Sequence, residues 1–158
     1  MLLYAAEVYS IPSSIAFLKN LAGLALNDNR LTGTVPNGIS ELHALQLLEL
    51  SNNTLHGTVP TGISALSALK ILSLHTNQFQ GQFPWGAVSA TGLLALKLGV
   101  NRFSGTIPES LSALSMLELL LVGNNSLEGA LTSIASASLS SLSVLHYAIV
   151  PLAKPEPN

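Results

Sequence analysis

The chain has 158 residues, of which 48% are hydrophobic and only 9% are charged. Eight acidic and six basic residues give a net charge of −2 without any basic run, which argues against a nucleic-acid-binding surface. Cysteine is absent, so a disulfide framework and cysteine metal sites are excluded. No segment is long and apolar enough to cross a bilayer. The apolar residues are therefore core, and a surface with so few charges is a candidate for contact with a partner or for aggregation.

A repeat of 24 residues organises the chain. Asparagine recurs at this interval, followed by an apolar residue two positions later and a glycine four positions later. These asparagines are Asn29, Asn53, Asn77, Asn101 and Asn125. A period of this length predicts a solenoid, in which each coil buries its apolar side only against its neighbours.

Residues 1–20 form a degenerate partial repeat. The dipeptide Ile11-Pro12 stands where later repeats have Val-Pro, but the asparagine position holds Ala5 and the glycine position holds Tyr9. We therefore expect the chain to open partway through a repeat.

Residues 21–141 form five repeats, each with three leucines at constant offsets before the asparagine apart from one valine, Val122. Leu48 and Leu50 alternate with Glu49, which is the period of a strand. Strands of successive coils must lie side by side and parallel. The asparagine ends each strand, where its amide can satisfy backbone groups inside the coil.

Glycine and proline occupy the return path of each coil, because the first tolerates unusual backbone angles and the second fixes its own. Apolar residues three and six positions after the proline, such as Ile39 and Leu42, have the spacing of one helical turn. The third repeat has Ala87 and Ala90 there, so we expect a looser turn.

The chain ends less regularly. Residues 142–150 can supply one more strand as a partial repeat, but no asparagine, glycine or proline follows in register. Residues 151–158 form a proline-rich tail, which we expect to be extended or disordered.

The stretch LAGLALNDNRLTGTVPNGISELHA matches the pattern LxxLxLxxNxLxGxIPxxLxxLxx almost throughout. The chain thus resembles the plant-type leucine-rich-repeat family, which includes the ectodomains of receptor-like kinases and receptor-like proteins and polygalacturonase-inhibitor-like proteins. The resemblance implies an α/β fold: a right-handed leucine-rich-repeat solenoid with a parallel β-sheet on its concave face. Short 3₁₀ or helical turns and loops are implied on the convex face.

The outward side chains of the concave sheet should form columns, because their alternates are held in the core. An apolar stripe lies there beside a small polar group, a combination that suits a peptide or protein ligand. The candidate binding residues are Leu47, Glu49, Ile71, Ser73, His75, Lys97, Leu119 and Leu121. The same columns would also arise if outward positions had simply drifted.

Catalysis finds little support in the sequence. Ser73 and His75 share a face of one strand, but no acid is at hand to orient the histidine. No histidine cluster, phosphate-binding loop or kinase signature occurs, so no enzyme activity, cofactor or metal is expected.

Two glycosylation motifs occur, each one residue before an asparagine of the 24-residue repeat. They place candidate glycans on Asn52 and Asn124, if the chain enters the secretory pathway. Coincidence is the other explanation, since the repeat itself supplies the second asparagine.

The function expected is a non-enzymatic module that recognises a protein or peptide on its concave sheet, as in a plant-type receptor ectodomain. The alternatives are an intracellular scaffold or adaptor and an inhibitor of a secreted hydrolase. The mid-repeat opening favours a segment of a longer, membrane-anchored parent, found outside the cell or at its surface. The absence of cysteine favours a complete cytoplasmic protein. Ends without polar caps also predict self-association.

Overall fold

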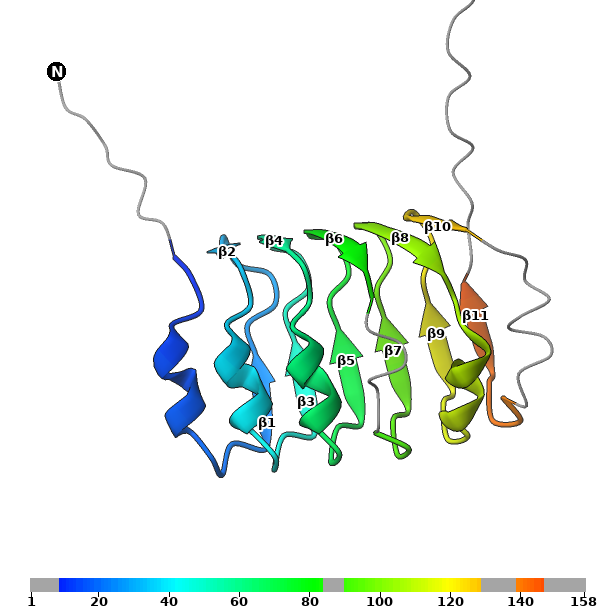
Figure 1. Ribbon diagram of the computed structural model, residues 1–158, viewed down its shortest axis with the longest axis horizontal. Coiled ribbons are helices and arrows are strands. Elements are labelled where there is room, and N and C mark those ends of the chain that lie inside the picture. The colour runs from blue at the N-terminus through cyan, green and yellow to red at the C-terminus, as the bar shows by residue number, and fades with distance from the viewer. Residues whose placement is uncertain (1–8, 84–89, 129–138, 147–158) are drawn as a thin grey trace, which may run out of the picture.

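The computed structural model describes residues 9–83, 90–128 and 139–146, which form a solenoid of stacked coils (Figure 1). Each coil adds one strand to a parallel sheet with the order β1-β3-β5-β7-β9-β11. These strands are β1 (Gly23–Ala25), β3 (Leu47–Glu49), β5 (Ile71–Ser73), β7 (Ala95–Lys97), β9 (Leu119–Leu121) and β11 (Val144–His146). The parallel leucine-rich solenoid implied by the repeat is thereby confirmed.

A second parallel sheet runs along one rim of the coils, at the top of Figure 1, in the order β10-β8-β6-β4-β2. Its strands are β2 (Thr32–Gly33), β4 (Thr54–Gly57), β6 (Gln78–Gln82), β8 (Arg102–Thr106) and β10 (Ser126–Glu128). The repeat glycine adopts positive φ here, as at Gly57 with φ 79°. A Cβ at Gly57 would lie 2.9 Å from Thr34 Cγ2, so this position needs glycine for both its backbone and its contacts.

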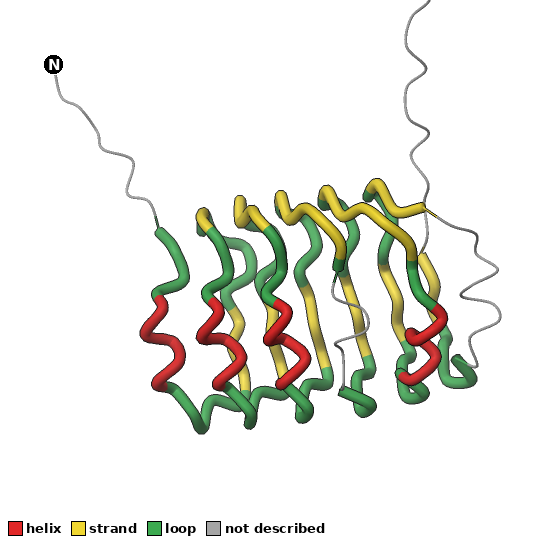
Figure 2. The backbone as a smooth tube through the Cα atoms, in the orientation of Figure 1, coloured by secondary structure: helices red, strands yellow, loops and turns green. Residues whose placement is uncertain are grey.

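Short 3₁₀ helices form the face opposite the six-stranded sheet (Figure 2). They are η1 (Ser13–Phe17), η2 (Asn37–Glu41), η3 (Thr61–Ala65) and η5 (Glu109–Ala113). Each follows the repeat proline, whose fixed φ suits the turn, and each buries the apolar residue three positions on, for example Ile39 after Pro36. Residues 84–89 lie outside the described residues, so the looser turn expected in the third repeat stays a prediction.

The repeat asparagines link neighbouring coils. Asn53 Oδ1 accepts from Leu31 N of the preceding coil at 2.9 Å, while its Nδ2 donates to Leu26 O of that coil and to Leu50 O of its own. Asn77, Asn101 and Asn125 repeat this arrangement. The ladder predicted from the 24-residue spacing is therefore a hydrogen-bonded structure, and these amides hold the coils together.

The core runs through the middle of the solenoid. Leu48, Leu72, Leu96 and Leu120 occupy equivalent places in successive coils and are almost completely buried. Leu145, in β11, is 40% exposed because no further described coil covers it. Burial thus depends on a neighbour on each side, as in other solenoids.

Candidate functional site

Strand pairing brings the predicted binding residues into two straight rows across the six-stranded sheet. One row places Leu47, Ile71, Ala95 and Leu119 next to one another, and the other places Glu49, Ser73, Lys97 and Leu121 next to one another. His75 follows β5, where the backbone bond from Asn52 N to His75 O continues the pairing. We call the eight predicted residues the concave patch: Leu47, Glu49, Ile71, Ser73, His75, Lys97, Leu119 and Leu121.

The apolar members of the concave patch are only partly covered. Their side chains are half-buried on the open face of the sheet. These residues are Leu47, Ile71, Leu119 and Leu121. Between Ile71 and Leu119 lies the small, buried side chain of Ala95. Half-buried apolar side chains on the open face of a sheet can accept an apolar group from a ligand.

Ser73 and His75 carry polar atoms that are buried without a hydrogen-bond partner among the described residues. These atoms are Ser73 Oγ and His75 Nδ1. Ser73 was expected to be open to a ligand, yet its side chain is fully buried. The reason is its size: the short serine side chain lies between the much longer side chains of Glu49 and Lys97 on the neighbouring strands. Because Ser73 and His75 form no bond to each other, they are not arranged as nucleophile and base.

The imidazole of His75 is held in its neutral form. Burial lowers its pKa from the ordinary value of 6.5, and Lys97 lowers it further, while Glu49 and Asp28 act in the opposite direction. A neutral imidazole has one donor and one acceptor nitrogen. His75 therefore carries no positive charge at neutral pH.

Glu49 and Lys97 place opposite charges on the two sides of Ser73. They form no ion pair with each other, because β5 separates their strands and two strand spacings amount to about 10 Å. Neither side chain has a hydrogen-bond or ion-pair partner within the described part of the chain. Both charges are thus available to a ligand lying across β3, β5 and β7.

The residue before each repeat asparagine adopts the left-handed conformation, a feature that the 24-residue pattern does not by itself predict. These residues are Asp28, Asn52, Thr76, Val100 and Asn124, with φ between 53° and 56°. The recurrence of Asp or Asn at this position was an available signal, since both tolerate this backbone region.

Two members of this column also bear on the site. Asn52 Nδ2 donates to Asp28 Oδ1 at 2.7 Å, and Asn27 Nδ2 donates to Asp28 Oδ2. The bond from Asn27, followed by that from Asn52, lowers the pKa of the Asp28 carboxyl. Of the two candidate glycosylation residues, Asn52 is therefore engaged by a neighbour, whereas Asn124 is exposed and has no such bond in the described structure.

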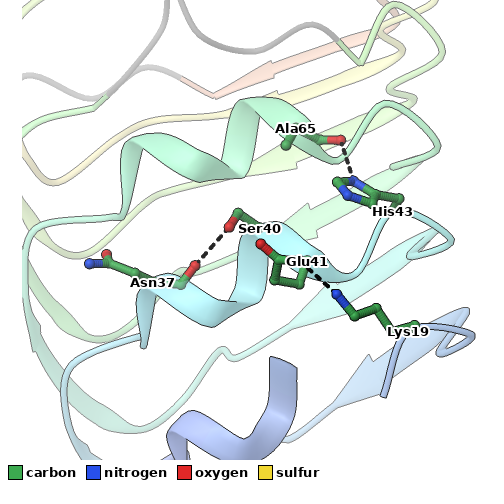
Figure 3. A network of polar contacts seen from close by, with 6 residues as sticks. All are labelled: Lys19, Asn37, Ser40, Glu41, His43 and Ala65. Atoms are coloured by element: carbon green, nitrogen blue, oxygen red, sulfur yellow. Dashed lines mark hydrogen bonds and ion pairs between the residues drawn. The ribbon is translucent and has the colours of Figure 1, made fainter. Parts of the chain in front are cut away.

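The convex face carries polar contacts of another kind (Figure 3). Lys19 Nζ donates to Glu41 Oε2 at 2.7 Å, and both side chains are about half exposed. His43 Nδ1 lies 3.4 Å from Ala65 O of the next coil. These contacts join successive coils, and the charges of Lys19 and Glu41 are paired with each other. We therefore interpret them as structural contacts and not as a binding site.

The hollows in the described structure lie away from the concave patch. A hollow of about 390 Å³ is lined by Phe17, Leu18 and Leu21, and one of about 240 Å³ is lined by Tyr9 and Arg30, among others. Both lie at the first coil and are shallow places at the end of the solenoid. Among the described residues no group of His, Asp or Glu is arranged to hold a metal ion. None of the helices in this part of the chain has the length and apolarity to span a membrane.

Comparisons with known proteins agree with the leucine-rich solenoid fold. A leucine-rich-repeat family model matches residues 19–79. The leucine-rich-repeat ectodomain of the receptor kinase SOBIR1 from Arabidopsis thaliana is 32% identical, with a TM-score of 0.73. That match covers 77% of this chain and 67% of the SOBIR1 chain. The chain belongs to the plant-type leucine-rich-repeat family.

Other members of the plant-type leucine-rich-repeat family are longer. One is the Arabidopsis receptor kinase HAESA, which was solved with the peptide hormone IDA and the co-receptor SERK1. It is 31% identical to this chain with a TM-score of 0.81, and the match covers 89% of this chain and 24% of the HAESA chain. The plant peptide hormone receptor RGFR1, in complex with RGF2, is 35% identical with a TM-score of 0.76, covering 84% of this chain and 21% of that receptor. The chain thus spans about a quarter of these receptors or less. None of the curated protein sequences compared with it matches significantly. No catalytic family is indicated.

Proposed function

We propose that this chain is a non-enzymatic recognition module that binds a peptide or protein segment on the concave patch. The carrying observation is the combination found there: half-buried apolar side chains beside two charges, Glu49 and Lys97, that have no partner among the described residues. Solved relatives bound to peptide hormones support the proposal, because their repeats share this fold.

Selection from a library of random dodecapeptides tests this proposal. The protein would be immobilised, and enriched peptides would be measured against Ile71→Glu, which puts a charge in the middle of the apolar row. Met116→Glu is the matched control, because Met116 is an exposed apolar residue beyond η5, away from the concave sheet. Enriched peptides should lose at least about tenfold in affinity for Ile71→Glu, as expected for a central anchor, and none for Met116→Glu.

Circular dichroism would establish that both variants keep their fold. Peptides that bind Ile71→Glu as tightly as the unaltered protein would show that the concave patch is not the binding surface. The proposal would then be wrong.

A further inference from the structure

His75 is the member of the concave patch whose charge can change near neutral pH. It follows β5, in the coil between those of Glu49 and Lys97. Its side chain is half-buried, and the inner nitrogen, Nδ1, is fully buried without a hydrogen-bond partner among the described residues. The remaining, exposed part of the ring is what a ligand on the patch would cover.

Protonation of this imidazole is unfavourable in the folded protein. A neutral ring can keep its proton on Nε2 and leave the buried Nδ1 bare, whereas a charged ring carries an N–H group on both nitrogens. The charged form of His75 therefore places an N–H group where the described structure offers no acceptor. A buried donor without an acceptor costs free energy, and a buried charge costs more.

Three charged groups from the neighbouring coils face His75, and they oppose one another. Lys97 of β7 repels a positive ring, while Glu49 of β3 and Asp28, which follows β1, attract it. Burial is the largest influence and lowers the pKa of His75 from its ordinary value of 6.5, and Lys97 lowers it further. The unoccupied patch is thus neutral at this position at neutral pH and takes up a proton under acidic conditions.

A ligand on the concave patch makes this protonation harder still. It removes water from the exposed part of the ring, and loss of water disfavours a charged group much more than a neutral one. Ligand binding and protonation of His75 therefore oppose each other, and linkage requires that each weaken the other by the same factor. The ligand acts by excluding water and needs no contact with the buried Nδ1.

We propose that the concave patch is a pH-sensitive surface, which holds its ligand while His75 is neutral and releases it when His75 is protonated. This proposal rests on the function proposed above and adds its regulation. Affinity is constant above pH 6.5 and falls as the pH decreases towards the lowered pKa of His75 in the free protein. A ligand that placed a carboxylate against the ring would bind more tightly in acid, which is the opposite of this expectation.

Affinity on the two sides of the transition tests the proposal. The probe is a histidine-free dodecapeptide from the library selection that requires Ile71, and its Kd would be measured at about pH 8 and about pH 5, the range over which histidine changes charge. We expect binding at least about fivefold weaker in acid, the lower end of ordinary coupling between two sites. Circular dichroism in acid would establish that the fold is kept. Equal affinities, or tighter binding in acid, would overturn the proposal.

Matched histidine variants assign the effect to one residue. His75→Gln has no ring to protonate, so its affinities at the two pH values should be equal, whatever their absolute size. His56→Gln is the control, because His56 is exposed on β4 of the second sheet, and this variant should keep the full pH dependence. A dependence that persists in His75→Gln would show that another group is responsible and that the proposal is wrong.

NMR titration of the His75 ring gives an independent measurement. Its pKa should be lower in the complex than in the free protein, because the ligand excludes water from the ring. The pH midpoint of release should move up in Lys97→Gln and down in Glu49→Gln, since the first side chain disfavours the charged ring and the second favours it. The same pKa in the free protein and in the complex would contradict the proposed coupling.

The selected peptides keep the two proposals distinguishable. If they require Ile71 but bind equally well at both pH values, the recognition function stands and only the pH switch is wrong. If none of them requires Ile71, the recognition function itself is wrong and the switch is wrong with it.

Discussion

At the scale of single residues, Val100 and Thr76 have the least favourable backbone in the described structure. Both are β-branched, and both adopt φ 55°, where a branched Cβ crowds the following carbonyl group. The equivalent positions hold Asp28, Asn52 and Asn124, whose side chains suit this region better. Val100 is also 47% exposed, so burial of its side chain contributes little free energy to offset the cost of this conformation.

Val100→Asn should therefore raise the free energy of unfolding by about 1 kcal/mol, since the left-handed conformation costs an ordinary residue roughly 1–2 kcal/mol. Urea denaturation would measure the change. Asn124→Val is the reciprocal control and should lower stability by a similar amount. Equal stability of all three proteins would show that the solenoid imposes no strain here.

His75 makes folding sensitive to pH. Burial is the main cause that lowers its pKa, with Lys97 acting in the same direction and Glu49 and Asp28 against it. Between the lowered pKa and the ordinary value of 6.5, the unfolded chain binds a proton that the folded chain does not. The stabilisation is therefore complete above pH 6.5 and decreases as the pH falls through that value towards the folded pKa.

The comparison of the unaltered protein with His75→Gln would measure this effect. Unfolding free energies at a series of pH values should show a steeper loss below pH 6.5 in the unaltered protein, because glutamine binds no proton. Parallel curves for the two proteins would contradict the burial of a neutral imidazole at this position.

At the scale of structural elements, the asparagine ladder differs between the end and the middle of the solenoid. Asn101 accepts from Phe79 N at 3.0 Å and donates to Leu74 O, Leu98 O and Gly99 O. Asn29 is exposed, and the hydrogen bonds of its side chain within the described residues go only to its own coil. The asparagine side chain therefore links two coils at position 101 but only closes its own coil at position 29.

Asn101→Ala should lower the free energy of unfolding by at least about 2 kcal/mol, because removing the amide leaves buried backbone groups unpaired at roughly 1–3 kcal/mol each. Asn29→Ala is the matched control and should cost less than half as much. Chemical denaturation measures both. A similar cost at the two positions would mean that the coil-to-coil bonds contribute little.

At the scale of the whole molecule, each coil is stabilised only by its neighbours. Val144 and Leu145 of β11 are 49% and 40% exposed, whereas Leu120 of β9 is fully buried. Stability in such an array is a sum of intrinsic and nearest-neighbour terms. Protection should therefore increase from the ends towards the middle.

Amide hydrogen exchange would measure this gradient. Amides of β5 and β7 should exchange most slowly, and those of β1 and β11 most rapidly, because opening of an end coil breaks only one interface. Sedimentation at the same concentration shows whether the sample is monomeric. Uniform protection from Leu21 to Leu145 in a monomer would contradict the prediction.

Much of this fold could be predicted from the order of residue types. The 24-residue period located the six strands of the large sheet, and the apolar residues three and six positions after the proline located the helical turns, which are 3₁₀ helices. The columns of the concave patch followed as well, since alternation along a strand and equal spacing between coils leave one register. What escaped was the left-handed conformation of Thr76 and Val100, because neither residue type signals it.

The sequence by itself determined the solenoid, the buried leucines and the outward rows, because these depend only on period and hydrophobicity. The tertiary structure alone decided that Ser73 is buried and that its hydroxyl and His75 Nδ1 have no hydrogen-bond partner among the described residues. The physical reason is that these properties depend on side chains from three neighbouring strands. Residues that lie 24 positions apart in the chain set one another's burial and charge only when the coils stack.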